Sequence, residues 1–315
     1  MTTYNILLSF NNNYTQHACV LLASVFENNK CHSFHIHIIH RGLSEKNCKI
    51  INDFCATYNA RVSFYYIDIK DYYFPNLGSH YISVDTYLRL FIADYLDNSI
   101  DRILYLDVDM IVNGDLSELL NTDIGNVVLA AIEDAPVAER FVRLRLESKL
   151  GYFNAGMLYI NMVKWRKLDI TKKSLEYLKK YPERILYHDQ DVLNAVIKGQ
   201  WKRVDFKWNM LDAFFWLPPL IQEKYTDELS TCKQDVRIIH YTGGVKPWHA
   251  WTKNPYYHKY YEYLKFTPWK DYKPSLSSQW RAYKFPRNVM TILHIDRLIW
   301  LLIQTKIIHI KSNRK

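Results

Sequence analysis

The first two thirds of the chain alternate between two patterns of hydrophobic positions. Short runs rich in β-branched and aromatic residues are followed by longer stretches in which apolar residues recur at helical spacing. This alternation is typical of βαβ units, which build a mostly parallel sheet with helices on both faces. We expect strands at residues 4–10, 33–41, 61–68, 102–106, 126–133, 157–160 and 236–241, and helices at 14–27, 44–58, 83–95, 171–181 and 191–197.

The last part of the chain departs from this α/β pattern. Residues 218–219 are two prolines and residues 222–234 are mostly polar, which predicts a loop there. The composition changes again near residues 268–274. We therefore expect one large α/β domain over residues 1–269 and a separate tail over residues 270–315.

The strand expected at 102–106 leads into two acidic residues, Asp107 and Asp109, with Val108 between them. In open α/β sheets, ligands bind beyond the carboxyl ends of the strands. Two carboxylates there are costly to remove from water unless a cation neutralises them, and a divalent ion would bring a phosphate-bearing ligand with it. Because Asp is also common in surface turns, this pattern alone leaves both interpretations open.

Three other segments place polar or small residues beside apolar runs. Residues 154–156, Asn-Ala-Gly, precede an expected strand and predict either a tight turn or a backbone that approaches a ligand closely. Residues 188–194 begin with His-Asp-Gln-Asp, which suits either helix capping or ligand binding. Residues 243–246, Gly-Gly-Val-Lys, form either a simple turn or a cradle for phosphate oxygens.

Charge and cysteine content narrow the setting. The net charge is +9, and residues 270–315 hold ten Lys or Arg and two Asp, so the rest of the chain is nearly neutral. The five cysteines are odd in number and lack a Cys-x-x-Cys pair, which favours a reducing cytosol over a disulfide scaffold or a zinc site. The first residues lack the basic region and long apolar stretch of a signal peptide. These features predict a cytoplasmic protein.

Four ordered motifs resemble glycosyltransferase family 8, the bacterial lipopolysaccharide glucosyl- and galactosyltransferases and their relatives. The motifs are Leu104-Tyr-Leu-Asp-Val-Asp109, Phe153-Asn-Ala-Gly156, Asp189-Gln-Asp191 and His240-Tyr-Thr-Gly-Gly-Val-Lys-Pro-Trp-His249, and the resemblance runs from about residue 5 to about residue 249. It implies a GT-A fold, which is a Rossmann-like α/β domain. It also implies a UDP-hexose donor, a saccharide acceptor, Mn²⁺ or alternatively Mg²⁺ as the cofactor, and retention of the anomeric configuration.

The resemblance also implies roles for individual residues. It makes Asp107, Asp109 and His240 the metal ligands, a set of two carboxylates and one imidazole that suits Mn²⁺. Family members often carry an acid where this chain has Asn11 or Asn12, although an Asn can still accept a hydrogen bond from the uracil N–H. The residues placed around the nucleotide sugar are Asn11, Asn13, Tyr14, Arg89, Asp107, Val108, Asp109, Glu133, Asp134, Asn154, Ala155, Gly243, Gly244 and Lys246.

The chemistry implied by the resemblance centres on the departing UDP and on Gln190. A bound dication would stabilise the leaving diphosphate as a Lewis acid, and Lys246 would add fixed positive charge. Gln190 lies where the family places a side chain near the anomeric carbon. Because an amide is a poor nucleophile, we expect same-face attack, with Gln190 stabilising the oxocarbenium-like state and Asp189 binding donor hydroxyls. Which of Glu133 and Asp134 touches the sugar stays open.

The tail mixes its basic residues with Trp, Ile and Leu between residues 280 and 310. Its longest apolar run, Leu298–Ile303, is too short to span a bilayer, which takes roughly 20 residues. We expect a helical tail that lies on an anionic membrane surface, which would place the enzyme on the inner face of the cytoplasmic membrane beside a lipid-linked acceptor. A helix that simply packs on the domain is the alternative. No recognised motif supports binding to nucleic acid.

Two functions from other classes compete with this prediction. Phosphatases of the haloacid dehalogenase type also carry Asp-x-Asp after an apolar strand and use Mg²⁺. Their motif usually stands near the start of the chain, whereas about a hundred residues precede it here. A non-catalytic sugar-binding protein is the other possibility, but it would have little use for both acids and His240.

Overall fold

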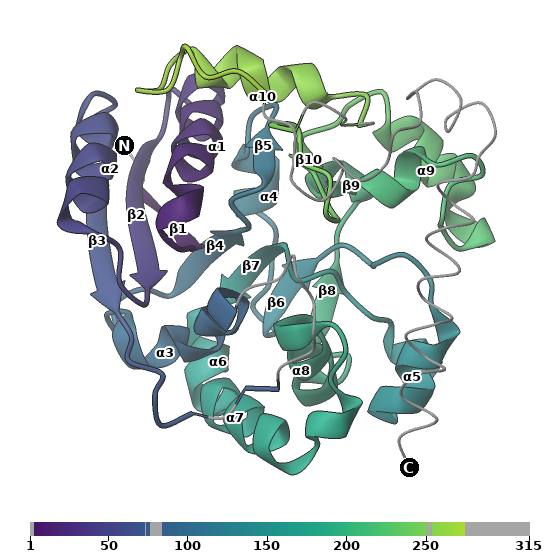
Figure 1. The fold of residues 1–315 in the computed structure, drawn as a ribbon. Helices are drawn as coiled ribbons and strands as arrows, with labels where there is room; N and C mark the ends of the chain where they lie inside the picture. Colours follow the sequence, from purple (N-terminus) through teal and green to yellow (C-terminus); the bar gives the residue numbers. More distant parts are fainter. Residues whose placement is uncertain (1–2, 73, 76–83, 250–251, 253, 275–315) are drawn as a thin grey trace, which may run out of the picture.

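A computed structural model describes residues 3–274 except 73, 76–83, 250–251 and 253. A seven-stranded sheet runs through the molecule (Figure 1). In spatial order its strands are β3 (Arg61–Tyr66), β2 (Ser33–His40), β1 (Thr3–Ser9), β4 (Arg102–Leu106), β7 (Met157–Asn161), β6 (Leu129–Ala131) and β8 (Trp201–Arg203).

The sheet is mostly parallel, as the sequence predicts, with one reversed strand. β3, β2, β1 and β4 are parallel neighbours, as are β6 and β8, whereas β7 is antiparallel to both β4 and β6. Leu106, at the end of β4, therefore pairs with Met157, at the start of β7. The reversal brings the turn before β7 next to the residues that follow β4.

Both faces of the sheet are buried, because successive residues of β1 and β4 pack into different cores. Leu104 and Leu106 join the core under α1 (Thr15–Asn28), whereas Ile103 and Tyr105 join the core on the opposite face. The first core also contains residues of α2 (Glu45–Ala56) and α10 (Tyr257–Leu264). The second core contains residues of α3 (Ile92–Tyr95), α6 (Met162–Lys167), α7 (Ile170–Lys180) and α8 (His188–Ile197), which lie below the sheet in Figure 1.

A small second sheet links the segment after β4 to the last third of the chain. Its three strands are β5 (Met110–Val112), β10 (Ile238–His240) and β9 (Met210–Leu211), in that order. His240 is opposite Met110 in the antiparallel pair and opposite Leu211 in the parallel pair. Two further short helices are α4 (Ser117–Leu120) and α5 (Ala138–Leu144).

The structure corrects several of the predicted elements. The segment 83–95 is mostly a 3-10 helix, Val84–Phe91, followed by α3, and Tyr87–Phe91 are all buried, which a one-sided amphipathic helix does not allow. The loop predicted at 222–234 is wrong: it holds a 3-10 turn and α9 (Thr226–Cys232). Helix α9 is mostly polar, with acids in its first turn, so its pair of buried apolar residues gave too weak a periodic signal. Helix α10 was not predicted, and the strand expected at 126–133 is only Leu129–Ala131.

Most of the predicted tail, residues 275–315, lies outside the described residues, so its helical form and the boundary near residue 270 stay predictions. Among the helices that the structure describes, none is both long enough and apolar enough to cross a bilayer.

Candidate active site

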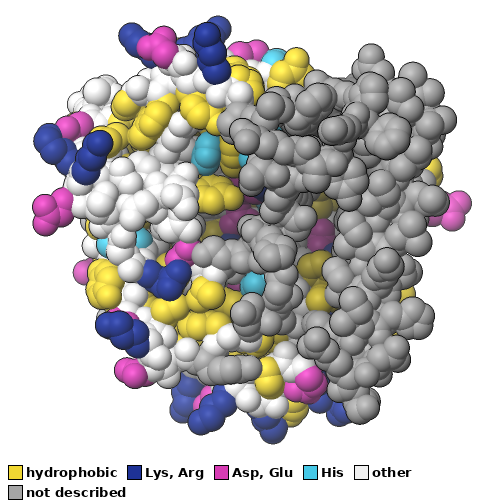
Figure 2. All heavy atoms as spheres, viewed as in Figure 1, with side chains coloured by type: hydrophobic (Ala, Val, Ile, Leu, Met, Phe, Trp, Pro, Cys, Tyr) yellow, Lys and Arg dark blue, Asp and Glu magenta, His cyan; other side chains and the backbone are white. Residues whose placement is uncertain are grey.

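The topology of the large sheet creates a ligand-binding position beside β1. The chain adds β2 and β3 on one side of β1 and then β4 on its other side. Ligands of open α/β sheets bind at such a switch point, beyond the carboxyl ends of the two strands. Residues 10–14 follow β1 and residues 107–109 follow β4. Figure 2 shows acidic side chains set back at the middle of this face of the molecule.

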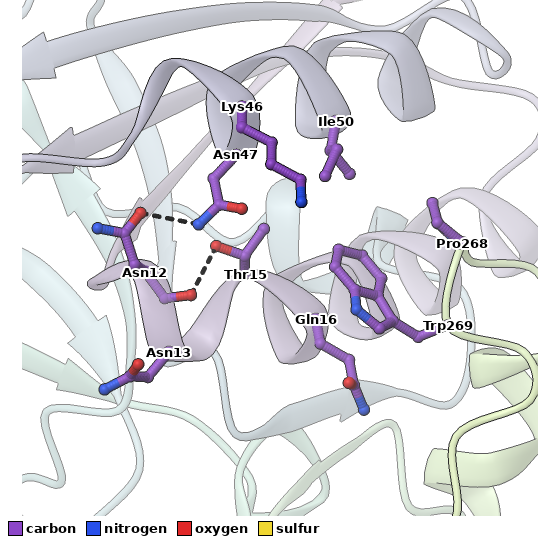
Figure 3. A pocket seen from close by; sticks show the side chains of 9 residues that line it. All are labelled: Asn12, Asn13, Thr15, Gln16, Lys46, Asn47, Ile50, Pro268 and Trp269. Atoms are coloured by element: carbon purple, nitrogen blue, oxygen red, sulfur yellow. Dashed lines mark hydrogen bonds between the residues drawn. The ribbon is translucent and has the colours of Figure 1, made fainter.

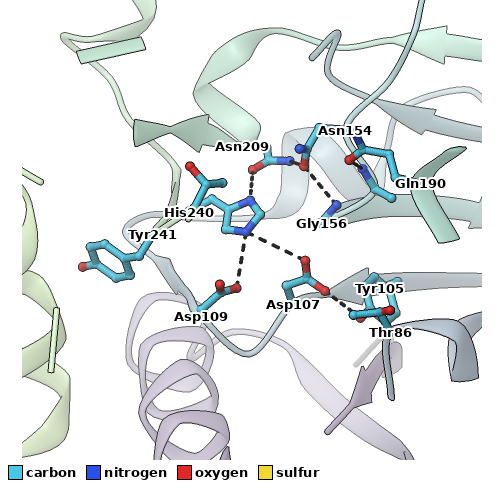
Figure 4. A network of polar contacts seen from close by, with 12 residues as sticks. Thr86, Tyr105, Asp107, Asp109, Asn154, Gly156, Gln190, Asn209, His240 and Tyr241 are labelled. Carbon is cyan, nitrogen blue, oxygen red and sulfur yellow. Dashed lines mark hydrogen bonds and ion pairs between the residues drawn. The ribbon is translucent and has the colours of Figure 1, made fainter. Parts of the chain in front are cut away.

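Asp107, Asp109 and His240 come together in this crevice (Figure 4). The His240 Nε2 lies 3.3 Å from Asp109 Oδ1 and 3.8 Å from Asp107 Oδ2. One ligand atom from each residue lies within 4.8 Å of the other two. Two carboxylate oxygens and one imidazole nitrogen are suitable ligands for Mn²⁺.

Two cations hold the outer oxygens of these carboxylates. Arg89 Nη2 and the Tyr105 hydroxyl each donate to Asp107 Oδ1 at 2.7 Å, and Lys246 Nζ donates to Asp109 Oδ2 at 2.5 Å. One oxygen of each carboxylate is thereby left facing His240. Burial opposes ionisation of Asp109, but Lys246 and then His240 hold the pKa of that carboxyl well below its usual range.

An amide chain orients the imidazole of His240. Its Nδ1 lies 2.9 Å from Asn209 Oδ1, and Asn209 Nδ2 donates to Asn154 Oδ1 at 2.9 Å. Gly156 N–H donates to the same Asn154 oxygen at 3.0 Å. Because both amides are fixed by these donors, Asn209 Oδ1 must accept from His240 Nδ1–H. The Nε2 lone pair is then directed at the two aspartates, as a metal ligand requires.

Gly156 allows the backbone to pass directly against the imidazole. A Cβ at this position would lie 2.4 Å from His240 Cε1 and 2.8 Å from its Nδ1. The Gly156 carbonyl also accepts from Asp107 N–H at 2.8 Å. The close approach expected for residues 154–156 is therefore to the predicted metal site itself.

Gln190 lies at the centre of a second group of contacts. Its Oε1 accepts from Ala155 N–H at 2.9 Å, and its Nε2 donates to Asp134 Oδ2 at 2.9 Å and to the Tyr152 hydroxyl at 3.2 Å. Arg140 Nη1 also donates to Asp134 Oδ2, at 2.7 Å. These contacts fix the amide of Gln190 in one orientation, and Figure 4 shows it beside Asn154.

The two acids that flank Gln190 face different partners. Asp189 pairs with the buried Arg89 guanidinium at 3.1 Å, and burial raises the pKa of Asp189 to about 7 against the opposing charge of Arg89. Asp191 is fully buried and accepts at 2.7 Å from Arg143, from the Tyr152 hydroxyl and from two backbone N–H groups just before α8. Asp191 therefore anchors the start of α8. Arg89 is buried, whereas the residues around it in the sequence would suggest a solvent-exposed position on a helix.

Glu133 and Asp134 point in different directions. Glu133 accepts from Gln222 Nε2 at 2.5 Å and from the Tyr225 hydroxyl at 2.7 Å, so it holds the segment before α9. Asp134 instead contacts Gln190, as described above. Of the two acids, Asp134 is the one that the structure brings next to the predicted catalytic amide.

The loop after β1, which is predicted to contact the nucleotide, contains Asn11, Asn13 and Tyr14. Asn12 is turned toward α2, where its Oδ1 accepts from Ser44 N–H at 2.9 Å and from Asn47 Nδ2 at 2.7 Å. A groove of about 460 Å³ lies on the side toward which Asn12 is turned. It is lined by residues of the loop after β1, of α1 and α2, and by residues 268–269, just before the predicted tail (Figure 3). The groove takes in Asn13 but none of the three predicted metal ligands, so it is separate from the metal site.

The loop after β10 carries Gly243, Gly244 and Lys246 into the crevice. Gly243 has φ +83°, and a Cβ there would meet nothing within 4 Å. The far end of the loop is fixed to α1, because Trp248 stacks on His17 with ring centroids 3.5 Å apart. This stack holds Lys246 near Asp109 and brings Tyr14 edge-on to Trp248.

Sequence reasoning missed two residues of this site. Asn209, which is fully buried, orients His240 as described above. Asp212 follows the strand residue that pairs with His240, and burial raises its pKa to about 7 although Asn254 donates to it. Only a polar residue inside a short apolar segment marks either position. That signal does not identify a partner that lies 31 residues away for Asn209 and 42 residues away for Asp212.

The sequence profile of glycosyl transferase family 8 matches residues 5–252 of this chain. The chain belongs to glycosyltransferase family 8. General stress protein A of Bacillus subtilis (strain 168) is 30% identical over 274 residues, which cover 84% of this chain and 94% of that protein. A lipopolysaccharide 1,2-glucosyltransferase of Escherichia coli is 29% identical over 294 residues, 90% of this chain and 85% of that protein. The family resemblance inferred from the four motifs is confirmed.

The fold of this family 8 glycosyltransferase also matches a solved structure. The galactosyltransferase LgtC, in complex with donor and acceptor sugar analogs, superposes with a TM-score of 0.74 at 27% identity. The match covers 88% of this chain and 99% of that one. The predicted α/β, GT-A-like fold is confirmed, and the phosphatase and the non-catalytic sugar-binding protein are not favoured.

Proposed function

We propose that this family 8 glycosyltransferase moves a hexose from a UDP-sugar to a saccharide acceptor, with Mn²⁺ as cofactor and with retention of the anomeric configuration. The observation that carries the proposal is the cluster of Asp107, Asp109 and His240 at the switch point of the sheet. The donor set fits Mn²⁺ better than Mg²⁺, because imidazole is a ligand that Mg²⁺ rarely takes.

The bound metal would act as a Lewis acid on the leaving diphosphate. Lys246 and the amides of Gly243 and Gly244 would supply further positive potential at that position. Arg89 would hold Asp107 and Asp189 in place through its two ion pairs. Tyr14 and Asn11, at the end of β1, would receive the base.

Gln190 would face the anomeric carbon, held by Ala155 and Asp134. Its fixed amide is suited to stabilise positive charge on the sugar and unsuited to attack it. Asp191 is also excluded as a nucleophile, since Arg143, Tyr152 and two backbone N–H groups occupy its oxygens. These contacts favour same-face attack, with the acceptor proton passing to the departing diphosphate.

The relatives suggest the sugar and the acceptor. One is a lipopolysaccharide 1,2-glucosyltransferase and another is a galactosyltransferase, which supports glucose or galactose as the donor hexose. The first name also supports a lipopolysaccharide-type or other lipid-linked saccharide as the acceptor. We place the enzyme in the cytoplasm, at the inner face of the membrane, through the basic tail of residues 270–315.

A donor panel tests the proposed reaction. UDP-glucose, UDP-galactose and UDP-N-acetylglucosamine are incubated with Mn²⁺, with Mg²⁺ and without metal, and UDP release is measured. One UDP-hexose should be hydrolysed fastest with Mn²⁺, and proton NMR of a transferred sugar should show the donor's anomeric configuration. Release that does not depend on metal, or an inverted product, would contradict the proposal.

The His240→Ala variant tests the metal ligand separately. UDP affinity should fall strongly in the presence of Mn²⁺ and much less in its absence, because only the metal-dependent part of binding is lost. An equal loss in both conditions would make His240 a structural residue. Calorimetric titration of UDP with and without Mn²⁺ measures both effects.

Deletion of residues 275–315 tests the membrane role. Full-length protein should sediment with vesicles of phosphatidylglycerol at low salt and release at high salt, whereas the deleted protein should stay in solution and keep UDP-sugar hydrolysis. Full-length protein that ignores these vesicles at low salt would refute the membrane role.

A further inference from the structure

The nucleotide loop lacks the acid that family members often carry, but a carboxylate from another segment lies beside it. Asp85, in the 3-10 helix Val84–Phe91, is buried with 5% exposure. Its Oδ2 accepts from Asn11 Nδ2 at 2.8 Å. Ser9 Oγ, at the end of β1, donates to the Asp85 carbonyl at 2.8 Å, which fixes the two segments together.

Two partners of opposite character fix the amide of Asn11. Asp85 carries a carboxylate, which can only accept, so it holds the NH₂ group of Asn11. Asn13 N–H can only donate, and it holds the Asn11 oxygen at 3.1 Å. Reversing the amide would break both hydrogen bonds and bring two acceptors together. Asn11 therefore presents its oxygen and its second N–H in one fixed order.

Arg41 holds this buried carboxylate in place. Its Nε donates to Asp85 Oδ1 at 2.7 Å, from a side chain that is 38% exposed. Each Asp85 oxygen thus has its own donor, and the one facing Asn11 is not free to rotate away. The carboxylate of Asp85 thus lies beside the loop after β1, although Asp85 belongs to the 3-10 helix Val84–Phe91.

We propose that Asp85 is a positioning residue for nucleobase selection, which makes Asn11 read uracil and reject cytosine. The inference rests on the proposed function, because it assumes that the base of a nucleotide sugar lies at the end of β1. Uracil presents an N–H at position 3 beside a carbonyl, which matches an amide oxygen beside an N–H. Cytosine presents a lone pair and an amino group at the same two positions, so both contacts are mismatched.

A freely rotating Asn would accept either base, because it could reverse its amide to suit cytosine. The selectivity therefore comes from Asp85, which never touches the base. Leaving polar groups unpaired in a buried site is the strongest form of discrimination available to a binding pocket. Asp85, which fixes the orientation of the Asn11 amide, thus takes the place of an acid that would contact the base directly.

A charge-swap cycle tests the proposal, with UDP and CDP as probes and calorimetry in Mn²⁺ as the measurement. Wild-type protein should prefer UDP by about a hundredfold or more, and Asp85→Asn should lower that preference about tenfold, because the paired amides can then reverse. Asn11→Asp alone should weaken UDP binding, since it places two carboxylates 2.8 Å apart. The double variant Asn11→Asp, Asp85→Asn should bind UDP more tightly than Asn11→Asp and restore the preference.

Controls separate this proposal from a structural role and from the proposed function. Asp53→Asn, which removes an exposed acid paired with Lys49 on α2, should change neither affinity nor preference. A folded Asp85→Asn protein with an unchanged UDP-to-CDP ratio, or a double variant no better than its singles, would overturn the proposal. Wild-type protein that binds neither nucleotide would overturn the proposed function instead.

Discussion

The crevice has two sides that are built differently. On the metal side, Asp107, Asp109 and His240 are brought together from β4 and β10, and the outer oxygens of the acids are held by the cations Arg89 and Lys246. On the sugar side, Gln190 is held by neutral and charged partners that use both atoms of its amide. The metal side is held by charge and the sugar side by hydrogen-bond geometry.

This difference predicts that substitutions on the two sides impair the enzyme in different ways. Changing a charge of Asp107 or Asp109 should remove the proposed ion while leaving the fold intact, since both residues lie in the turn between β4 and β5. Changing a hydrogen-bonding group on the sugar side should leave ligands bound but less well aligned. The same reasoning separates residues that would bind the metal directly from residues that position its ligands.

Asp109→Asn should have the largest effect. Loss of one anionic ligand should lower transfer on the order of 10³-fold, because a bound metal contributes several kcal/mol to stabilising the leaving group. Turnover with Mn²⁺ and circular dichroism measure activity and fold. The exposed-loop variant Asp123→Asn is the matched control, and a folded Asp109→Asn protein with near-normal turnover would break the comparison.

Gly156→Ala tests whether the metal side depends on position as well as charge. The added Cβ would lie 2.4 Å from His240 Cε1, so the imidazole must move. We expect Mn²⁺ affinity in the presence of UDP to fall about 10- to 100-fold, as for other changes that misplace a ligand. Electron paramagnetic resonance of free Mn²⁺ measures it.

Gly42→Ala is the matched control for Gly156→Ala, because Gly42 is not part of the proposed site. A Cβ at Gly42 would meet nothing within 4 Å, so only its positive φ makes alanine unfavourable. We expect its Mn²⁺ affinity to stay within about threefold of wild type, with a loss of stability of about 1 kcal/mol from backbone strain. Equal losses of Mn²⁺ affinity in the two variants would contradict the steric explanation.

Gln190→Ala tests the sugar side. Turnover should fall about 10- to 100-fold while the donor KM changes less than about threefold, because the amide acts when charge develops on the sugar. Steady-state hydrolysis of the preferred UDP-hexose gives both constants. If KM rises as much as kcat falls, Gln190 belongs to donor recognition and the two sides of the crevice work alike.

Asp212→Asn should give the smallest effect, a change in the pH dependence of stability. Burial raises the folded-state pKa of Asp212 to about 7, above its unfolded value, so the folded protein binds the extra proton and loses stability as pH rises from about 4 to 7. Asn removes this loss and can still accept from Asn254. The Tm of the variant relative to wild type should therefore increase between pH 5 and pH 8, and a constant difference would contradict the assignment.

The sequence predicted the fold well where a regular pattern of hydrophobic positions extended over a whole strand or helix. The first three strands, the first two helices and the parallel pairing of these strands were predicted from the alternation of strand and helix patterns, because both faces of the sheet had to be covered. It predicted poorly where packing overrides periodicity. Tyr87–Phe91 are buried on all sides and form a 3-10 helix, and α9 is too polar to show a stripe.

The candidate site was predictable to the same limited degree. The motifs identified Asp107, Asp109 and His240 as the predicted metal ligands, and the structure brings these three residues together. The sequence did not separate Glu133 from Asp134, because the two are adjacent and only the fold shows that Glu133 turns to Gln222. Asn209 and Asp85 were missed because each acts through a residue that is distant in the sequence.

The small sheet of β5, β10 and β9 has a consequence for the order in which the protein acquires activity during synthesis. Both strands at the switch point, β1 and β4, belong to the first 106 residues of the chain. His240 lies on β10, between two strands that come earlier in the chain: β5 ends 126 residues before β10 begins, and β9 ends 27 residues before it. The proposed metal site is therefore incomplete until β10, the last of these strands, has been synthesised.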